Sequence, residues 1–334
     1  MEPVKEEKLI SVIGGSGFVG QRLMPLLIQR GHRVNNLDVA APGSQIAGAS
    51  YLATDVRDRA ALVANLRGSD LIVNLAAVHR DDVRPLSLYD EVNVDGAKNI
   101  CAAADALGIK NQIFASSVAI YGFQPGIPNE DSPAQPFNDY GRTKWEAEKV
   151  YRAWQAADAQ VKRLVIVRPT VIFGPGNRGN IYNLVAQLAS GLFVMVGDGT
   201  NKKSIAFVSN VAAFFSHMVE YESDRAGLYV YNYCDKDDFD MNELLSVVRG
   251  AIGKPTSSRF RLPYGLGLAM GSAADIVASL ARRPLPISRI RVEKFCANTV
   301  FEADRLRQTG FSPSYNLRDA LIETVKHEFP PRER

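Results

Sequence analysis

The sequence predicts an α/β protein with a doubly wound parallel sheet and a smaller C-terminal lobe, on three observations. Short apolar runs alternate with segments of helical periodicity through the first half of the chain. A glycine-rich turn joins the first apolar run to the first helical segment. After Pro169 the elements become shorter and prolines more frequent, which indicates a change of architecture. Strand–helix alternation of this kind is typical of a parallel sheet covered by helices on both faces.

Each element has its own signal. Leu9–Ile13 is a short, β-branched-rich run that ends in glycines, so it is expected to be a buried strand. Helical periodicity then continues over 18–30 and stops at Gly31. The other strands are expected at 33–39, 51–55, 71–76, 111–116 and 163–168. The other helices of this half are expected at 58–67, 86–107 and 139–159.

The domain boundary is expected near residue 170. Residues 1–169 are predicted to form the first domain, to which the segment 206–225, with a helix at about 210–222, returns. Residues 170–330 are predicted to form mainly the lobe, with segments 170–205, 228–241 and 255–315 as its parts. A chain of 334 residues suits this division into two bodies.

The composition excludes several classes of protein. Net charge is only +3, so a nucleic-acid-binding surface is not indicated. Cys101, Cys234 and Cys296 are far apart, which implies neither a disulfide framework nor a metal site. The charged N-terminus lacks an apolar run and is not a signal peptide; residues 1–7 are expected to be a disordered tail. A cytoplasmic protein is therefore predicted.

Residues 14–20, Gly-Gly-Ser-Gly-Phe-Val-Gly, lie between the first strand and the first helix. They can be read as GxxGxxG or as GxGxxG, and both patterns let the backbone approach a pyrophosphate at a helix N-terminus. Asp38 ends the next strand, where its carboxylate can accept hydrogen bonds from a ribose and repel a 2′-phosphate. The motif predicts a Rossmann-type site for NAD rather than NADP.

Further cofactor contacts are expected at the ends of the following strands. Asp55 could bind the adenine amino group or could cap the helix near residue 58, and the sequence leaves both alternatives open. Small residues after the fourth strand let a dinucleotide come close. The complete predicted set is Gly14, Gly17, Phe18, Val19, Gly20, Asp38, Asp55, Val56, Leu75, Ala76, Ala77, Asn93, Tyr140 and Lys144.

A catalytic set is predicted from three residues. Tyr140 and Lys144 are four residues apart and share one face of the predicted helix. A nearby ammonium favours the phenolate form of a tyrosine. Ser117 follows the fifth strand, at the sheet edge that also carries the glycine turn. Serine, tyrosine and lysine beside a nicotinamide would suit hydride exchange between an alcohol and a ketone.

These motifs resemble the extended short-chain dehydrogenase/reductase superfamily over nearly the whole chain. The shared elements are the glycine turn, Asn-Leu-Ala-Ala at 74–77, Ser-Ser-Val-Ala-Ile-Tyr-Gly at 116–122, the Tyr140–Lys144 pair and Arg-Pro-Thr at 168–170. The resemblance implies that Tyr140 is the acid/base, that Ser117 is its partner, and that Lys144 binds the nicotinamide ribose. It also implies a homodimer formed by the helices at 86–107 and 139–159.

The residues after Ser117 indicate the reaction. Sugar dehydratases of the superfamily usually carry an acidic pair there, whereas this chain has Val118 and Ala119. The segment looks like that of sugar 4-epimerases. In the implied mechanism Tyr140 removes the C4 hydroxyl proton while NAD takes the C4 hydride. The 4-keto sugar then rotates and receives the hydride on its other face, so NAD stays bound.

A closer resemblance is to the bacterial undecaprenyl-diphosphate N-acetylglucosamine 4-epimerases of O-antigen assembly. It rests on residues 79–83, 174–180, 195–201 and 288–296. The substrate contacts expected from these segments and from the active site are His79, Arg80, Ser117, Asn177, Arg178, Lys203 and Arg291. Nucleotide-sugar epimerases usually have arginine where Lys203 stands and Arg-x-Gly-Asp where this chain has Arg-Val-Glu-Lys at 291–294. The departure favours a lipid-linked diphosphate over a UDP-sugar.

Three other functions remain open at this level. A UDP-N-acetylglucosamine or UDP-glucose 4-epimerase would share the chemistry. An NAD(P)H-dependent 4-ketosugar reductase would release its cofactor at every turnover. A dinucleotide sensor could have the same fold without needing the serine, tyrosine and lysine.

The segment from Tyr264 to Leu280 is rich in apolar residues. One helical face would carry Leu266, Met270, Ala273, Val277 and Leu280, with Ser272, Asp275 and Ser279 on another. Arg259, Arg261, Arg282 and Arg283 flank the segment. Such a helix could lie in a membrane interface, or it could pack on the core of the lobe.

Overall fold

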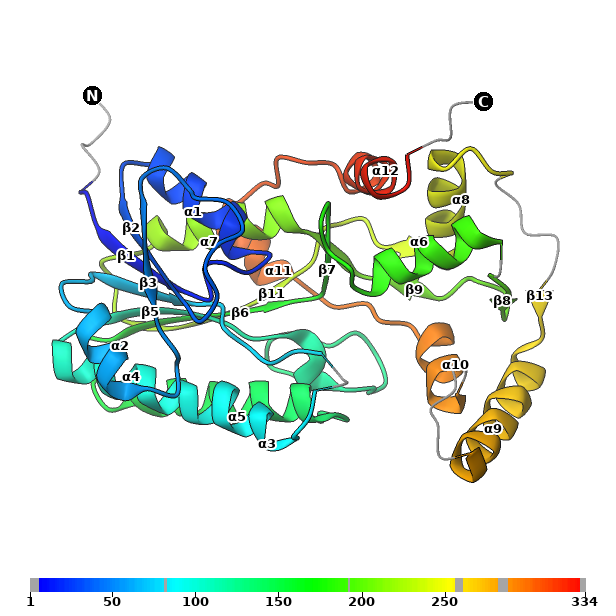
Figure 1. The fold of residues 1–334 in the computed structure, drawn as a ribbon, viewed down its shortest axis with the longest axis horizontal. Helices are drawn as coiled ribbons and strands as arrows, with labels where there is room; N and C mark the ends of the chain where they lie inside the picture. Colours follow the sequence, from blue (N-terminus) through cyan, green and yellow to red (C-terminus); the bar gives the residue numbers. More distant parts are fainter. Residues whose placement is uncertain (1–5, 81–82, 192, 256–260, 282–287, 331–334) are drawn as a thin grey trace. The chain divides into compact units, whose positions relative to one another are not determined.

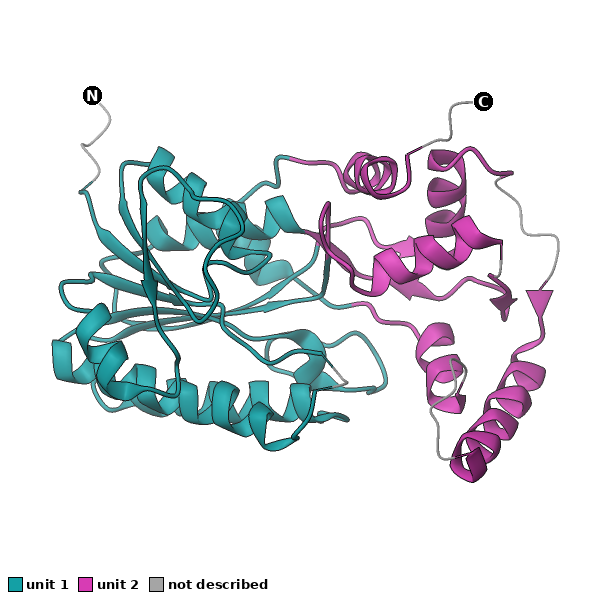
Figure 2. Cartoon of the chain, viewed as in Figure 1, with its two compact units in different colours: residues 1–172, 208–234, 301–314 teal, residues 173–207, 235–300, 315–334 magenta. Residues whose placement is uncertain are grey.

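The computed structural model describes residues 6–80, 83–191, 193–255, 261–281 and 288–330. It contains two compact units (Figure 2). The first unit comprises residues 1–172, 208–234 and 301–314, and the second comprises residues 173–207, 235–300 and 315–334. Arg259, Arg282, Arg283, Asp81, Asp82 and most of the expected N-terminal tail lie outside the described residues.

A seven-stranded sheet forms the centre of the first unit, in the order β11-β6-β5-β4-β1-β2-β3. Its strands are β1 (Leu9–Ile13), β2 (Arg33–Asp38), β3 (Ala49–Ala53), β4 (Leu71–Asn74), β5 (Asn111–Ala115), β6 (Arg163–Pro169) and β11 (Gly227–Tyr233). All neighbouring strands in it are parallel. The strand order reverses between β1 and β4, so a crevice for a ligand is expected beyond the carboxyl ends of these two strands.

Helices cover both faces of this sheet (Figure 1). On one face α1 (Gly20–Gln29) packs against α7 (Val208–Glu220). On the other face α4 (Gly96–Leu107) packs between α2 (Arg59–Asn65) and α5 (Asp139–Ala156). β4 is completely buried and so are nearly all residues of β1, which explains their continuous apolar sequences. The predicted fold class is confirmed.

The lobe is smaller than predicted, because β11 belongs to the first unit. Residues 228–241 were expected in the lobe, but Gly227–Tyr233 pairs with the whole of β6 at the edge of the central sheet. Residues 301–314, with the short helix α11 (Asp304–Gln308), also belong to the first unit. The sequence of β11 is strand-like, but no local signal indicates which sheet it joins, because pairing with β6 is a long-range interaction.

The helix expected at 86–107 is divided into three parts. A short helix α3 (Ser87–Tyr89) leads into a π-helical segment, η1 (Asp90–Asp95), and only then into α4. A π turn has i→i+5 hydrogen bonds and is found often at functional sites. Asn93 lies in this segment and is buried.

The second unit contains short strands and helices. Its helices are α6 (Asn180–Ser190), α8 (Met241–Ala251), α9 (Tyr264–Ala281), α10 (Arg289–Cys296) and α12 (Leu317–Glu328). Its short strands are β8 (Met195–Val196), β9 (Lys202–Lys203), β10 (Ile205–Phe207), β12 (Phe239–Asp240) and β13 (Arg261–Leu262), while β7 (Val171–Phe173) crosses the boundary. Helix α8 begins with a capping box between Asp240 and Glu243.

Candidate active site

The glycine turn closes tightly against the end of β4. Gly14 has a φ of +77°, and a β-carbon placed on it would lie 2.6 Å from the backbone nitrogen of Ala76. A β-carbon on Gly20 would lie 2.4 Å from the carbonyl oxygen of Gly15. Any larger residue at either position would push the turn away from the sheet, so the glycines keep the backbone where a pyrophosphate can approach it.

The residues around this turn fit a dinucleotide with an unphosphorylated ribose. Val19, the N-cap residue of α1, makes no side-chain hydrogen bond to the first turn of the helix, so no side chain covers the positive end of the helix dipole where a phosphate would bind. The Asp38 carboxylate accepts hydrogen bonds from the N–H of Ser16 at 3.1 Å and from that of Ala40 at 3.0 Å. Asp38 is thereby fixed beside the turn, where the adenosine ribose would lie.

Replacing Asp38 with alanine is expected to weaken the discrimination between NAD and NADP. A hydrogen bond to a charged group contributes about 1.5–3 kcal/mol, so the affinity for NADP relative to NAD should rise about tenfold or more. Cofactor titration of the cofactor-free protein measures this ratio. Asp158→Ala, an exposed carboxylate after α5, is the matched control. An unchanged ratio would contradict the proposed role of Asp38.

Asp55 forms an ion pair instead of a helix cap. The Arg57 guanidinium lies 2.7 Å from its carboxylate and lowers the pKa of Asp55 by hydrogen bonding. The cap of α2 is Asp58, which accepts the N–H of Ala61 at 3.0 Å. The alternative that Asp55 caps this helix was therefore wrong, and its contact with adenine stays a prediction. Val56 is buried, and its carbonyl accepts the Asn99 side chain at 3.0 Å.

Two buried asparagines hold the backbone that follows β4. Asn74 donates to the Tyr151 hydroxyl at 2.8 Å and accepts the N–H of Ala76 at 3.0 Å. Asn93 accepts the N–H of Val78 at 2.8 Å and donates to the Val78 carbonyl at 3.0 Å. The Asn93 amide thus fixes the backbone at Val78, and its predicted contact with the cofactor stays a prediction.

Ser117 and Tyr140 come together at the carboxyl edge of the sheet. Ser117 follows β5, and its hydroxyl also accepts the N–H of Ala119 at 3.1 Å. Tyr140 lies in the first turn of α5, which Asn138 caps by accepting the N–H of Gly141. Burial raises the pKa of the Tyr140 phenol, and its hydrogen bond with Ser117 lowers it. The predicted serine–tyrosine pair is thus a direct contact.

Lys144 is buried one turn further along α5. Its ammonium donates to the carbonyl of Ala115 at 2.8 Å and lies 4.9 Å from the centre of the Phe114 ring. Burial lowers the pKa of Lys144 to about 7, while the Glu148 carboxylate acts to raise it. The hydrogen bond to the end of β5 holds the ammonium near Ser117, at the edge of the sheet where Tyr140 also lies.

The lowered pKa of Lys144 predicts a pH dependence of stability in the cofactor-free protein. In the unfolded chain the pKa is near 10.5, so from about pH 7 to 10.5 the unfolded chain binds a proton that the folded chain does not. The free energy of unfolding of the wild type relative to Lys144→Met should therefore rise with pH across this window and be constant below it. Denaturant titrations of both proteins measure the difference. A flat difference would contradict the buried, desolvated ammonium.

A buried ion network next to Lys144 was missed by the sequence analysis. Glu148 has no exposed surface and accepts two hydrogen bonds from Arg168, at 2.8 and 2.7 Å. Arg168 also donates to the Tyr121 hydroxyl at 2.7 Å and to the Glu130 carbonyl at 3.0 Å. The signal was present, because Glu148 is four residues after Lys144 and therefore lies on the buried face of the same helix.

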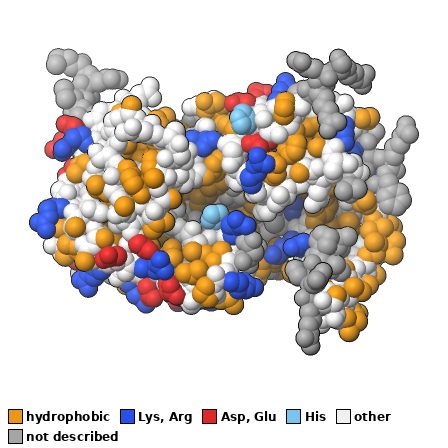
Figure 3. All heavy atoms as spheres, viewed as in Figure 1, with side chains coloured by type: hydrophobic (Ala, Val, Ile, Leu, Met, Phe, Trp, Pro, Cys, Tyr) orange, Lys and Arg blue, Asp and Glu red, His pale blue; other side chains and the backbone are white. Residues whose placement is uncertain are grey.

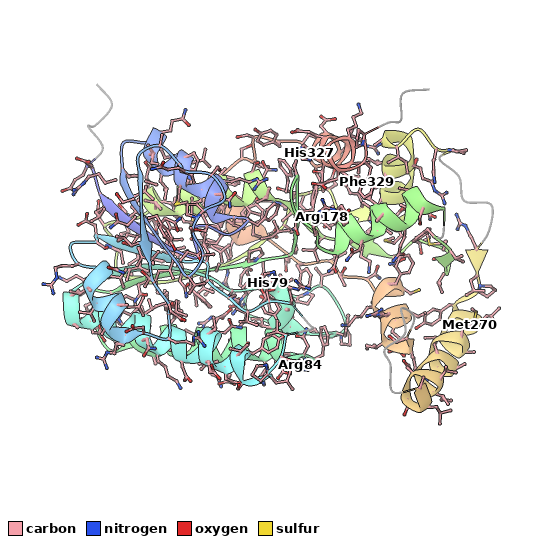
Figure 4. All side chains as sticks on the ribbon, in the orientation of Figure 1. His79, Arg84, Arg178, Met270, His327 and Phe329 are labelled. Atoms are coloured by element: carbon pink, nitrogen blue, oxygen red, sulfur yellow. The ribbon has the colours of Figure 1, made fainter. Side chains whose placement is uncertain are left out.

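His79 and Arg80 follow β4 and are exposed. Figure 4 labels His79. His79 Nδ1 lies 3.5 Å from the carbonyl of Ala77, and the Tyr89 hydroxyl donates to the carbonyl of Arg80. Both residues therefore lie at the carboxyl edge of the sheet in the first unit, and their contact with a sugar stays a prediction.

The other predicted substrate contacts belong to the second unit. Arg178 is exposed, stacks on the Tyr182 ring at 4.4 Å, and pairs with Glu328 at 3.8 Å. Glu328 also accepts the N–H of Gly176 at 2.6 Å. The loop that contains Asn177 and Arg178 is thereby tied to the C-terminal end of α12, as the positions of Arg178, His327 and Phe329 in Figure 4 illustrate.

Lys203 was predicted to contact the substrate, and in the structure its ammonium binds backbone carbonyls of the protein itself. Its ammonium donates to the carbonyls of Lys294 at 3.1 Å and of Ala297 at 2.6 Å, at the C-terminal end of α10. A cation there interacts favourably with the helix dipole, so Lys203 holds α10 in place. Burial lowers the pKa of Lys203 to about 8. Arg291 is exposed in the first turn of that helix.

A doubly wound parallel sheet, a glycine turn at its switch point and a serine–tyrosine–lysine set define an NAD-dependent enzyme of the short-chain dehydrogenase/reductase class. A profile of the NAD dependent epimerase/dehydratase family matches residues 10–233. The chain belongs to this family, and the resemblance inferred from its motifs is confirmed.

Two relatives are named as sugar 4-epimerases, and their names give different carriers for the sugar: undecaprenyl diphosphate in one and UDP in the other. The chain is 44% identical over 320 residues to the N-acetyl-α-D-glucosaminyl-diphospho-ditrans,octacis-undecaprenol 4-epimerase of Escherichia coli O157:H7, covering 96% of this chain and 95% of that protein. It is 30% identical over 261 residues to the UDP-glucose 4-epimerase of Vibrio cholerae, covering 75% of this chain and 78% of that protein.

Solved structures have the same fold. The UDP-glucuronic acid 4-epimerase from Bacillus cereus in complex with NAD superposes with a TM-score of 0.75 at 18% identity, over 96% of this chain and 98% of that one. The Thermus thermophilus UDP-glucose 4-epimerase in complex with NAD has a TM-score of 0.73 at 21% identity, over 96% and 98% of the two chains.

Proposed function

We propose that this protein is an NAD-dependent 4-epimerase that interconverts N-acetylglucosamine and N-acetylgalactosamine on undecaprenyl diphosphate, for the synthesis of O-antigen or another surface polysaccharide. The observation that carries the chemistry is the hydrogen bond between Ser117 and Tyr140, with the buried ammonium of Lys144 one helical turn away. The 44% identity to a relative named for the undecaprenyl-linked sugar supports the choice of substrate.

The three side chains have different tasks in the reaction. Tyr140 takes the proton of the C4 hydroxyl and returns it after the sugar has turned. Ser117 donates a hydrogen bond to the C4 oxygen and so stabilises the carbonyl. Lys144, when protonated, favours the Tyr140 phenolate, and it would also position the nicotinamide ribose. NAD, which the glycine turn, Asp38 and Lys144 would hold, would supply the acceptor and donor of the C4 hydride.

The chain after Ser117 supports epimerisation over dehydration. Val118 and Ala119 occupy the short 3-10 helix that follows the serine, and neither can donate a proton to a leaving hydroxyl. A 4-keto sugar formed at this site would therefore keep its C6 hydroxyl and be reduced again. This reaction consumes no cofactor, so NAD should remain bound to the purified enzyme.

The proposal is tested by offering the purified protein two substrates in parallel without added cofactor. These are undecaprenyl-diphospho-N-acetylglucosamine in detergent micelles and UDP-N-acetylglucosamine, and the released sugars are assayed for N-acetylgalactosamine. Conversion of the lipid-linked sugar alone is the expected result. Conversion of UDP-N-acetylglucosamine alone would contradict the carrier and retain the chemistry.

A UDP-sugar 4-epimerase is the second candidate, because the Vibrio cholerae relative bears that name. The position of Lys203 weighs against it, since nucleotide-sugar epimerases usually have an arginine there and this lysine is bound to carbonyls of α10. Conversion of neither substrate, even with NAD added, would favour the 4-ketosugar reductase and would require a test with NADH and a 4-ketosugar.

Location and assembly follow from the same proposal. We expect the enzyme in the cytoplasm, and an undecaprenyl-anchored substrate favours peripheral contact with the inner face of the cell membrane. We expect a homodimer formed through α4 and α5, as in other extended short-chain dehydrogenases. Light scattering of the purified protein measures the assembly.

A further inference from the structure

We propose that the outer face of helix α9 is the surface by which this enzyme docks on an anionic lipid bilayer. The inference rests on the proposed function, because a lipid-linked substrate is what makes a membrane the partner. The first observation is the distribution of exposed residues on the helix. One described helix, Tyr264–Ala281, is long and apolar enough to cross a membrane, with a mean hydropathy of 1.3 over 18 residues.

One broad, exposed face of α9 is apolar. Its members recur every three or four residues, so they form one continuous face of a 3.6-residue helix. They are Leu266, Ala269, Met270, Ala273, Ile276, Val277 and Leu280. Leu280 is 81% exposed and Ile276 is 63% exposed, so this face is not covered by the rest of the second unit. Exposed apolar patches of this kind mark interaction surfaces.

The opposite side of the helix is made of small residues. Gly267 and Gly271 are the buried residues of α9. A β-carbon on Gly271 would lie 2.8 Å from the backbone of Arg289, and one on Gly267 would lie 2.5 Å from the Val196 side chain. The helix therefore packs on α10 and β8 by close approach of its backbone, which leaves its large apolar side chains pointing outward (Figure 3).

The single charged residue of α9 lies outside this apolar face and is bonded to α10. The Asp275 carboxylate accepts the N–H of Arg289 at 3.0 Å, at the start of α10. A helix that crossed a bilayer would have to give up this hydrogen bond and the packing on α10. The arrangement instead suits a helix that lies in the interface, with its apolar face about 5–10 Å into the headgroup boundary.

The basic residues of the neighbouring helix α10 indicate which headgroup charge the surface prefers. α10 packs on α9 and contains Arg289, Arg291 and Lys294 with Glu293 as its one acid. Its Ile290 is also 46% exposed. Basic residues beside an inserted apolar face attract anionic headgroups, and each contributes only within a Debye length of the surface. The pair of helices thus fits an anionic bilayer better than a neutral one.

The test is flotation of the purified full-length protein with vesicles of phosphatidylethanolamine and phosphatidylglycerol, and with vesicles of phosphatidylcholine. The wild type should bind the anionic vesicles, and high salt should weaken the binding. The triple variant Ile276→Ser/Val277→Ser/Leu280→Ser should lose at least tenfold in vesicle affinity. The matched control, Ile127→Ser/Val161→Ser/Leu228→Ser, removes three exposed apolar side chains of the first unit and should bind as the wild type does.

Turnover separates this inference from the proposed function. The α9 triple variant should keep its activity on a water-soluble short-chain polyprenyl diphosphate sugar and lose at least tenfold on substrate embedded in vesicles. A wild type that epimerises the lipid-linked sugar in detergent but does not float would overturn the docking surface alone. A wild type that floats but converts no lipid-linked sugar would overturn the proposed function alone. Loss of a dimer in the triple variant, with no flotation of the wild type, would assign the face to a second copy of the chain.

Discussion

Replacing Tyr140 with phenylalanine is expected to lower the epimerisation rate by about 10³-fold, because a positioned acid/base contributes about 10²–10⁴-fold. The change removes one oxygen atom from a partly buried ring at the start of α5, so the fold should be unaffected. The measurement is the steady-state rate on the lipid-linked sugar, with NAD content determined after denaturation of the purified protein. NAD content should remain that of the wild type.

The matched control is Tyr229→Phe. Tyr229 lies in the first half of β11, opposite Val165 of β6 and away from the carboxyl edge of the sheet, so its hydroxyl should not affect the rate. Retention of more than a tenth of the activity in Tyr140→Phe would remove Tyr140 from the proposed role. A rate that falls equally in both variants would indicate a general effect of tyrosine removal and would give no support to the acid/base assignment.

Replacing Glu148 with glutamine is expected to have the largest effect on stability. Arg168 is fully buried and loses the carboxylate that accepts two of its hydrogen bonds. Breaking a buried ion pair by removing one partner destabilises a protein by about 3–5 kcal/mol, because the remaining charge is uncompensated. The free energy of unfolding, measured by denaturant titration at pH 7, should fall by this amount.

The double variant Glu148→Leu/Arg168→Met separates charge imbalance from the loss of a favourable pair. Replacing both partners of a buried pair by apolar residues is often neutral, so the double variant should recover most of the lost stability. If Glu148→Gln and the wild type had the same free energy of unfolding, the buried Arg168 charge would not need the Glu148 carboxylate for its stabilisation. A double variant as unstable as the single one would contradict the explanation by an unpaired charge.

The same ion pair connects the active-site helix α5 to β6, the neighbour of the strand that leads to Ser117. Glu148 belongs to α5, which also has Tyr140 and Lys144, and Arg168 belongs to β6, next to the strand that leads to Ser117. The network continues to Asn232 of β11, whose side chain accepts the Tyr121 hydroxyl at 2.7 Å. Elements distant in sequence are thus held together by buried polar groups that are fully engaged with one another.

Much of the site was predictable because its signals are local. The glycine spacing at 14–20 and the four-residue spacing of Tyr140 and Lys144 each lie within one turn or one helix, where sequence determines geometry. Asp38 was predictable because it ends a strand of known direction. For Asp55 the local signal was ambiguous, because a carboxylate after a strand can bind a ligand, cap a helix or pair with an arginine, and here Arg57 is its partner.

The substrate side was less predictable because its interactions are long-range. Lys203 follows a turn and was expected to meet a diphosphate, yet its ammonium binds carbonyls more than 90 positions later in the chain. Arg178 is likewise paired with Glu328 from the last turn of α12. Lysine and arginine reach several ångströms from the backbone, so the sequence alone does not determine which partner they meet.

The sequence by itself determined the parallel α/β sheet, the dinucleotide turn and the serine, tyrosine and lysine, since each depends on periodicity or short spacing. Only the tertiary structure decided that β11 completes the sheet, that Glu148 and Arg168 pair beneath the active site, and that α9 turns its apolar face outward. Strand pairing, charge burial and the exposure of a helix face depend on which distant segments pack together. For α9 the deciding contacts are the close approaches at Gly267 and Gly271, which fix the face that meets the protein and leave the other to solvent.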